Sequence, residues 1–254
     1  MYLYSVFELL GIDLFIVESR PVLYIKSADS LVVADIHLGY EDALASQGLF
    51  LPKTQLRKAL KVIKDSRDRT SARRLIINGD IKHVFDRLTR QERVEVENLL
   101  SEALDAGFKE IIFIRGNHDN YVTPILRNYG VTIIDDILDI GSGVVLTHGH
   151  LDLDIGSDYI IIGHEHPAVQ LDTGGYREKF KALLLIPTIK DSLIIVIPAL
   201  GEYQVGNTIT LDRGSYLSPI TRNLGVIEDS IPIIVDQRLG VQPLIRLREL
   251  YAKI

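Results

Sequence analysis

The clearest regularity along the chain is a run of apolar, mostly β-branched residues that ends abruptly in Asp, Asn or His. It occurs five times, in the segments SLVVADIHLG, RRLIINGDIKH, EIIFIRGNHDN, GVVLTHGH and YIIIGHEHP. Apolar runs of this length without alternation are typical of strands covered on both faces. Helical spacing of apolar residues in TQLRKALKVIKDS and RQERVEVENLLSEALDAG, between some of these runs, predicts βαβ crossovers. The pattern therefore predicts an α/β fold with parallel strands.

The polar residues that end these runs are expected to lie together. Parallel strands place their carboxyl ends on one edge of a sheet, and open α/β sheets bind ligands in the crevice at that edge. All seven histidines of the chain fall in the five strand ends, whereas structural histidines would be scattered over helices and surface. Each alone has an ordinary explanation, such as a helix cap or a loop residue. Together they predict a single site with histidine ligands.

Composition limits what such a site could hold. The chain has no cysteine, so a disulfide framework and a thiolate site are both excluded, and nitrogen and oxygen must hold any metal. Imidazole, carboxylate and amide ligands suit Mn(II), Fe or Zn better than Mg, which prefers oxygen ligands.

No repeat, low-complexity segment or long linker divides the 254 residues, which predicts one domain over residues 1–254. The apolar segment 1–20 carries three acidic residues and no basic start, so we interpret it as part of the fold of a cytoplasmic protein without a membrane span.

The net charge of −6 argues against a broad electrostatic surface for duplex DNA. Segment 53–74, with nine Lys or Arg and two Asp, is interpreted as a solvated helix face, and a phosphate-facing stripe is the alternative.

Five motifs occur in an order and spacing that resemble the calcineurin-like metallophosphoesterases. They are D-x-H (Asp35, His37), G-D (Gly79, Asp80), G-N-H-D (Gly116 to Asp119), H-G (His148, Gly149) and G-H-x-H (Gly163 to His166). The match spans residues 31–167. The segments ADIHLGYE, GDIKH and GHEHP are similar to a small archaeal branch related to the DNA-repair nuclease SbcD and to the ligase-associated phosphoesterases of bacteria.

This resemblance implies two divalent metal ions, with Mn²⁺ favoured by the family and Fe or Zn as alternatives. One ion would be held by Asp35, His37 and His166. The second would be held by Asn117, His148 and His164, and Asp80 would bridge both. Two such ions lower the pKa of a shared water and clamp the oxygens of a phosphoryl group, so no protein nucleophile is required.

Three further residues receive catalytic roles from the resemblance. His118 would point at the phosphate and donate a proton to the leaving oxygen, and Asp119 would orient its imidazole. His83, three positions after the bridging aspartate, follows the nuclease form of the motif and would contact a phosphodiester; a helix-start histidine is the alternative. His150 is left open between a contact near the phosphate and a simple loop residue.

The resemblance implies a four-layer α-β-β-α sandwich, whose second sheet would be completed by strands in residues 181–254. Only about 88 residues follow His166, which leaves little for a DNA-embracing cap. We therefore expect an open site and a phosphodiesterase or nuclease acting on nucleotide-sized diesters or single-stranded DNA ends. A phosphomonoesterase and a non-catalytic scaffold are the alternatives, and an isoleucine-rich strand edge could pair with a second copy of the chain.

Overall fold

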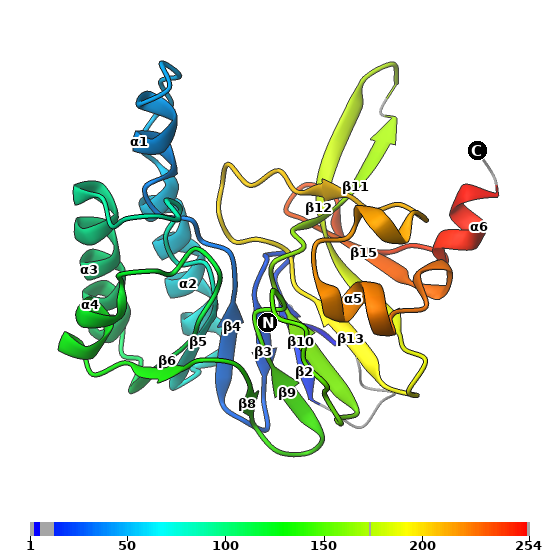
Figure 1. Ribbon diagram of the computed structural model, residues 1–254, viewed down its shortest axis with the longest axis horizontal. Helices are drawn as coiled ribbons and strands as arrows, with labels where there is room; N and C mark the ends of the chain where they lie inside the picture. The colour runs from blue at the N-terminus through cyan, green and yellow to red at the C-terminus, as the bar shows by residue number, and fades with distance from the viewer. Residues whose placement is uncertain (1–2, 6–12, 173, 253–254) are drawn as a thin grey trace.

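The computed structural model describes residues 3–5, 13–172 and 174–252. Two β-sheets face one another, and helices cover the outer face of each (Figure 1). Helices α1 to α4 lie on one side and α5 and α6 on the other. The helices are α1 (Tyr40–Ala45), α2 (Gln55–Thr70), α3 (Arg90–Asp105), α4 (Thr123–Asn128), α5 (Pro219–Leu224) and α6 (Leu247–Tyr251), with short 3₁₀ turns at Arg213–Ser215 and Ile227–Asp229.

The first sheet has its strands in chain order. They are β1 (Leu3–Ser5), β2 (Leu14–Val17), β3 (Leu23–Ile25), β4 (Ser30–Val33), β5 (Arg74–Asn78), β6 (Glu110–Ile114) and β7 (Thr132–Ile134). Strands β1 to β4 pair antiparallel, and β4 to β7 pair parallel through the helical crossovers α2, α3 and α4. The expectation that the N-terminal segment belongs to the fold is confirmed for β1 and β2, while residues 1–2 and 6–12 lie outside the described residues.

The second sheet runs in the order β14-β11-β12-β13-β10-β9-β8, with β15 against β12 and β16 against β15. Its strands are β8 (Leu138–Asp139), β9 (Val144–Leu146), β10 (Tyr159–Ile162), β11 (Pro167–Asp172), β12 (Arg177–Pro187), β13 (Leu193–Val196), β14 (Asn207–Thr208), β15 (Ile231–Asp236) and β16 (Gly240–Pro243). Strands β9, β10 and β13 are mutually parallel. The strands expected after residue 181 are present, and the sheet also takes in β8 to β11.

Three apolar cores separate the four layers. One lies between the first sheet and α2 to α4, the second between the sheets, and the third between the second sheet and the C-terminal helices. Strand β4 shows why the strands are apolar at successive positions. Leu31 and Val33 enter the first core, whereas Val32 enters the second. Side chains alternate across a strand, so a strand buried on both faces must be apolar at every position. The continuous apolar runs thus produce the four-layer fold implied by the resemblance.

The five polar clusters come from both sheets. Strands β4, β5 and β6 of the first sheet carry three of them, and β9 and β10 of the second sheet carry the two histidine pairs. The expectation that one sheet edge gathers all five clusters was therefore wrong. The carboxyl ends of two parallel strand groups meet instead, and main-chain bonds join them: Gly201 N–H donates to the carbonyl of Asp35 at 3.0 Å.

None of the helices in the described part of the chain combines the length and apolarity needed to cross a membrane.

Candidate metal centre

Asp80, after β5, stands at the centre of the site. Its Oδ1 accepts a hydrogen bond from the main-chain N–H of His118 at 3.0 Å, which orients the carboxylate. The other oxygen, Oδ2, lies 3.4, 3.8 and 4.0 Å from the Nε2 atoms of His148, His37 and His118. A carboxylate oxygen surrounded by imidazoles in this way can be shared by two cations.

The first group of converging ligand atoms contains Asp35, His37 and His166. Nε2 of His37 lies 3.3 Å from Nε2 of His166, which in turn lies 3.2 Å from Oδ1 of Asp35. Ligand atoms bound at about 2.1 Å to one ion stand roughly 3–3.5 Å apart, so these separations fit a single metal ion.

The second group contains Asp80, His148 and His164. Nδ1 of His148 lies 3.0 Å from the carbonyl of Asn78, so the ring presents Nε2 to the site. That Nε2 and the Oδ1 of Asn117 are buried atoms without a hydrogen-bond partner. Unpaired buried polar atoms cost free energy, and both atoms are of a kind that divalent ions bind. The group therefore fits a second ion, and its unpaired Oδ1 makes Asn117 a candidate for a further ligand.

The backbone at the site is strained. Five residues of the two groups adopt positive φ, between 46° and 64°: Asp35, His37, Asp80, His164 and His166. A left-handed conformation costs a non-glycine residue roughly 1–2 kcal/mol. Strain of this kind persists only where the surrounding structure imposes it, and it concentrates at functional sites.

Two glycines allow the close approach of strand ends. A Cβ on Gly79, whose φ is +80°, would lie 2.2 Å from Nδ1 of His148. A Cβ on Gly116 would lie 2.2 Å from Oδ1 of Asp80. Both positions exclude any side chain, because neither neighbour can move without leaving the site.

The charges of the site favour the binding of a cation. Burial opposes ionisation of Asp80, but the neighbouring His148 holds its pKa below the usual range. Burial likewise opposes charge on His148, yet Asp80 raises its pKa to about 10. Asp35 is buried as well, and His166 keeps its pKa low, whereas burial lowers the pKa of His37 to about 3. In the protein alone a proton on His148 compensates the carboxylates, and a divalent ion would replace it.

Asp119 supports the main chain of the site. Its Oδ2 accepts hydrogen bonds of 2.7 Å from the N–H groups of Asp80 and Gly116, and its Oδ1 accepts one of 3.0 Å from that of Ile81. The imidazole of His118 instead has Nδ1 2.5 Å from the carbonyl of His83. The expectation that Asp119 orients the His118 ring was therefore wrong, because three main-chain donors converge on this carboxylate.

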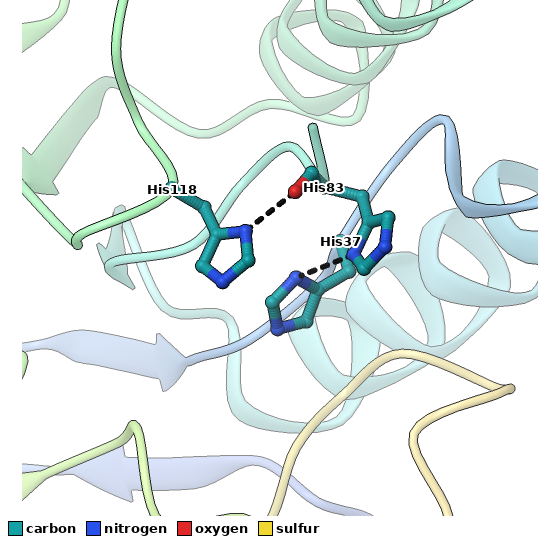
Figure 2. Close-up of side chains that lie close together, drawn as sticks. All are labelled: His37, His83 and His118. Carbon is teal, nitrogen blue, oxygen red and sulfur yellow. Dashed lines mark hydrogen bonds between the residues drawn. The ribbon is translucent and has the colours of Figure 1, made fainter. Parts of the chain in front are cut away.

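His37, His83 and His118 form a cluster of three imidazoles (Figure 2). Nδ1 of His37 lies 3.4 Å from Nδ1 of His83, and the rings of His83 and His118 stack with 5.6 Å between centroids. Burial lowers the pKa of His83 to about 4, so this ring is neutral at neutral pH. His83 therefore lies in the site and does not act as a helix cap, since α3 begins only at Arg90.

His150 also reaches the site, with its ring centroid 5.3 Å from that of His148 and 6.2 Å from that of His164. Its Nδ1 is buried without a hydrogen-bond partner.

The basic segment on α2 behaves as a solvated face. Lys61 and Lys64, for example, form ion pairs with Asp65 and Glu102.

Three buried polar residues that the sequence did not single out hold the ligand loops. Glu165, between two ligand histidines, accepts hydrogen bonds of 2.8 Å from the N–H groups of Leu217 and Ser218. Gln55 donates to the carbonyl of Ile36, and the carboxylate of Glu92 accepts from the main chain of His83. The charge of Glu165 between His164 and His166, directly after an apolar run, was a usable signal, whereas nothing in the local sequence marks Gln55.

Comparisons with known proteins agree with this fold. The sequence profile of the calcineurin-like phosphoesterases matches residues 30–168. No curated protein sequence matches the chain. Among solved structures, nuclease MPE of Pseudomonas putida aligns with a TM-score of 0.66 at 20% identity, over 92% of this chain and 96% of the nuclease, which shows a common fold.

Two further structures are more distant. The phosphoesterase YfcE of E. coli has a TM-score of 0.40 at 19% identity over 70% of this chain and 83% of its own. A single mutant of Vps29 from Entamoeba histolytica has a TM-score of 0.32 at 16% identity over 68% of this chain and 76% of its own.

Proposed function

Because the chain belongs to the calcineurin-like phosphoesterase family, we propose that it is a metal-dependent phosphodiesterase or nuclease that acts on phosphodiester bonds of nucleotides or single-stranded DNA ends. The observation that carries the proposal is the pair of ligand groups that meet at Asp80, beside the cluster of His37, His83 and His118. A scaffold has no need for this cluster or for the strained backbone at the site.

In the proposed site, Asp35, His37 and His166 would hold one divalent ion, Asn117, His148 and His164 would hold the other, and Asp80 would be shared by both. Mn²⁺ is the proposed metal, as the family favours, with Fe or Zn as alternatives, because mixed nitrogen and oxygen donors suit these ions better than Mg²⁺. When bound, two such ions supply a nucleophile at neutral pH and neutralise charge on the phosphoryl oxygens.

The hydrogen bonds within the cluster of His37, His83 and His118 set the proton positions of these rings. If Nε2 of His37 is a ligand, it carries no proton, so Nδ1 of His37 donates to Nδ1 of His83 across 3.4 Å. The proton of a neutral His83 must then be on Nε2, where it can donate to a phosphate oxygen. His118 is fixed in the same manner, because its Nδ1–H donates to the carbonyl of His83.

His118 is therefore the proposed general acid. Its Nε2 remains available on the side of Asp80 Oδ2, 4.0 Å away, and an imidazolium there can pass a proton to the leaving oxygen. Asp80 Oδ2 faces that Nε2. His83 contributes a neutral donor, which suits the single negative charge of a phosphodiester better than the two charges of a monoester.

The test is hydrolysis of bis-p-nitrophenyl phosphate and p-nitrophenyl phosphate by the Mn²⁺-reconstituted protein, with the wild type, His83→Ala and His83→Asn. We expect the diester to be preferred and its kcat to fall roughly 100-fold in His83→Ala, the loss typical of removing one donor to a developing charge. His83→Asn keeps an N–H donor and should recover part of the rate. Monoester preference would favour a phosphatase, and inactivity on both substrates would favour a scaffold.

A further inference from the structure

Two exposed aromatic side chains border the loops that carry the proposed catalytic histidines. Phe85 follows His83 by two positions and is 55% exposed, and Tyr121 follows His118 by three and is 63% exposed. Aromatic side chains contribute most to stability when buried, so their exposure beside a site indicates a contact that is completed by a ligand.

The two loops hold each other in place. The side-chain amide of Asn120 donates a hydrogen bond of 3.1 Å to the carbonyl of Phe85. The ring of Phe85 stands at 86° to the imidazole of His118, with 5.9 Å between centroids. The Phe85 ring thus packs directly against His118, the residue proposed to donate a proton to the leaving oxygen.

Tyr121 is presented by a strained backbone. Its φ is +68°, in the left-handed region that bulky side chains rarely adopt. The residues around it are anchored, because Asp119 and Val122 are fully buried. An exposed side chain held in a strained conformation by rigid neighbours is a common feature of ligand clamps.

We propose that Phe85 and Tyr121 form a base-stacking subsite that binds an unpaired nucleobase adjoining the phosphodiester at the metal centre. This inference rests on the proposed function, and it names the part of the substrate that the metal centre does not contact. Aromatic rings stack on any base, and they need the open face that a duplex does not offer. With a net charge of −6, the protein gains affinity from stacking more readily than from a basic surface.

Tyr40 and Tyr203, two further aromatic residues near the site, are engaged with one another. The rings of Tyr40 and Tyr203 stack at 5.8 Å and 19°, and Tyr40 also packs edge-on against His83. The hydroxyl of Tyr203 donates to the carbonyl of Pro52. These contacts support the loops, and they leave the base contact to Phe85 and Tyr121.

The kinetic test compares thymidine 5′-(p-nitrophenyl phosphate) with methyl p-nitrophenyl phosphate. The two diesters share a leaving group, and only the first has a base. We expect Phe85→Leu to lower the ratio of their kcat/KM values about tenfold, the effect of losing one stacked ring, and Phe85→Tyr to retain the ratio. Tyr121→Asn, which tolerates the left-handed backbone, should lower the ratio as well.

Ile189→Ala is the matched control. Ile189 is 68% exposed and lies in the turn between β12 and β13, beside the amino end of β10 and therefore at the opposite edge from His164. The Ile189→Ala variant should hydrolyse both diesters at the wild-type rate. Equal losses on both diesters in Phe85→Leu, or no loss on either, would overturn the subsite.

A binding measurement separates this inference from the proposed function. Fluorescence anisotropy with EDTA present compares a labelled thymidine decamer with an abasic decamer of equal length. The wild type should bind the thymidine decamer more tightly, and Phe85→Leu should lose the difference. If the preference holds but no diester is cleaved, the proposed function fails and the subsite stands; if the wild type binds both decamers equally, the subsite is refuted.

Discussion

The carboxylate of Asp119 accepts a hydrogen bond of 2.7 Å from the main-chain nitrogen of Asp80. Asp119, which follows the proposed general acid His118 in the chain, thus holds the main chain of Asp80, the residue proposed to bridge the metal ions. The same carboxylate also binds the N–H groups of Gly116 and Ile81, so it joins the loops after β5 and β6. The position of Asp80 depends on this junction.

Replacing Asp119 tests that junction. Asp119→Asn puts an NH₂ group where main-chain N–H groups need an acceptor, so we expect the free energy of unfolding to fall by about 1–3 kcal/mol and the bound Mn²⁺ to decrease. Denaturant unfolding and elemental analysis of the dialysed protein measure the two effects.

The same substitution in a His118→Ala background provides the control. If Asp119 acts on the main chain, Asp119→Asn should reduce the metal content equally whether or not His118 is present. A loss of metal that depends on the imidazole would show that Asp119 works through His118 instead.

His118 itself should affect turnover without affecting the metal. Its ring bonds to the carbonyl of His83, and its Nε2 is 4.0 Å from Asp80 Oδ2. We expect His118→Ala to lower kcat on a phosphodiester by about 10²- to 10⁴-fold, as for the loss of a general acid, with the metal content unchanged. Wild-type turnover in this variant would remove His118 from catalysis.

Metal stoichiometry should separate the two ligand groups. The wild type should bind two Mn²⁺ ions per chain, His166→Ala should retain one, and Asp80→Asn should weaken both because that carboxylate lies in reach of both groups. Mass spectrometry of the native protein counts the ions. Complete loss of metal in His166→Ala would contradict the proposal that two ligand groups bind separate ions and share only Asp80.

Lys181, which is not a proposed ligand, should make the stability of the protein depend on pH. Its ammonium donates to the carbonyls of Ala199 and Gly201, in the loop that bonds to the main chain of Asp35, and burial lowers its pKa to about 8. Between pH 8 and 10.5 the unfolded chain holds this proton and the folded chain does not, so the free energy of unfolding rises with pH in that window.

The measurement compares the wild type with Lys181→Met, which keeps the length of the side chain without a titratable group. From pH 8 to 10.5 the free energy of unfolding of the wild type should rise relative to that of Lys181→Met, by at most about 1.4 kcal/mol per pH unit. A difference that does not vary with pH would show that Lys181 has an ordinary pKa.

The sequence by itself determined the strands and the chemistry of the site. Apolar runs such as Leu31 to Val33 must be covered on both faces, and this requirement follows from the local order of residues alone. The absence of cysteine limited the donors to nitrogen and oxygen, and the five strand ends contained all seven histidines. These conclusions depend on residue type and order along the chain, which folding does not change.

The tertiary structure decided how those residues face one another. Strands β9 and β10 carry their histidines in the second sheet, because hydrogen bonding between strands is set by contacts distant in sequence. The role of Asp119 depends on where the N–H groups of Asp80 and Ile81 point, and these directions follow from a left-handed backbone at Asp80. The exposure of Phe85 beside His118 likewise exists only where two loops meet, so no local pattern in the sequence could reveal it.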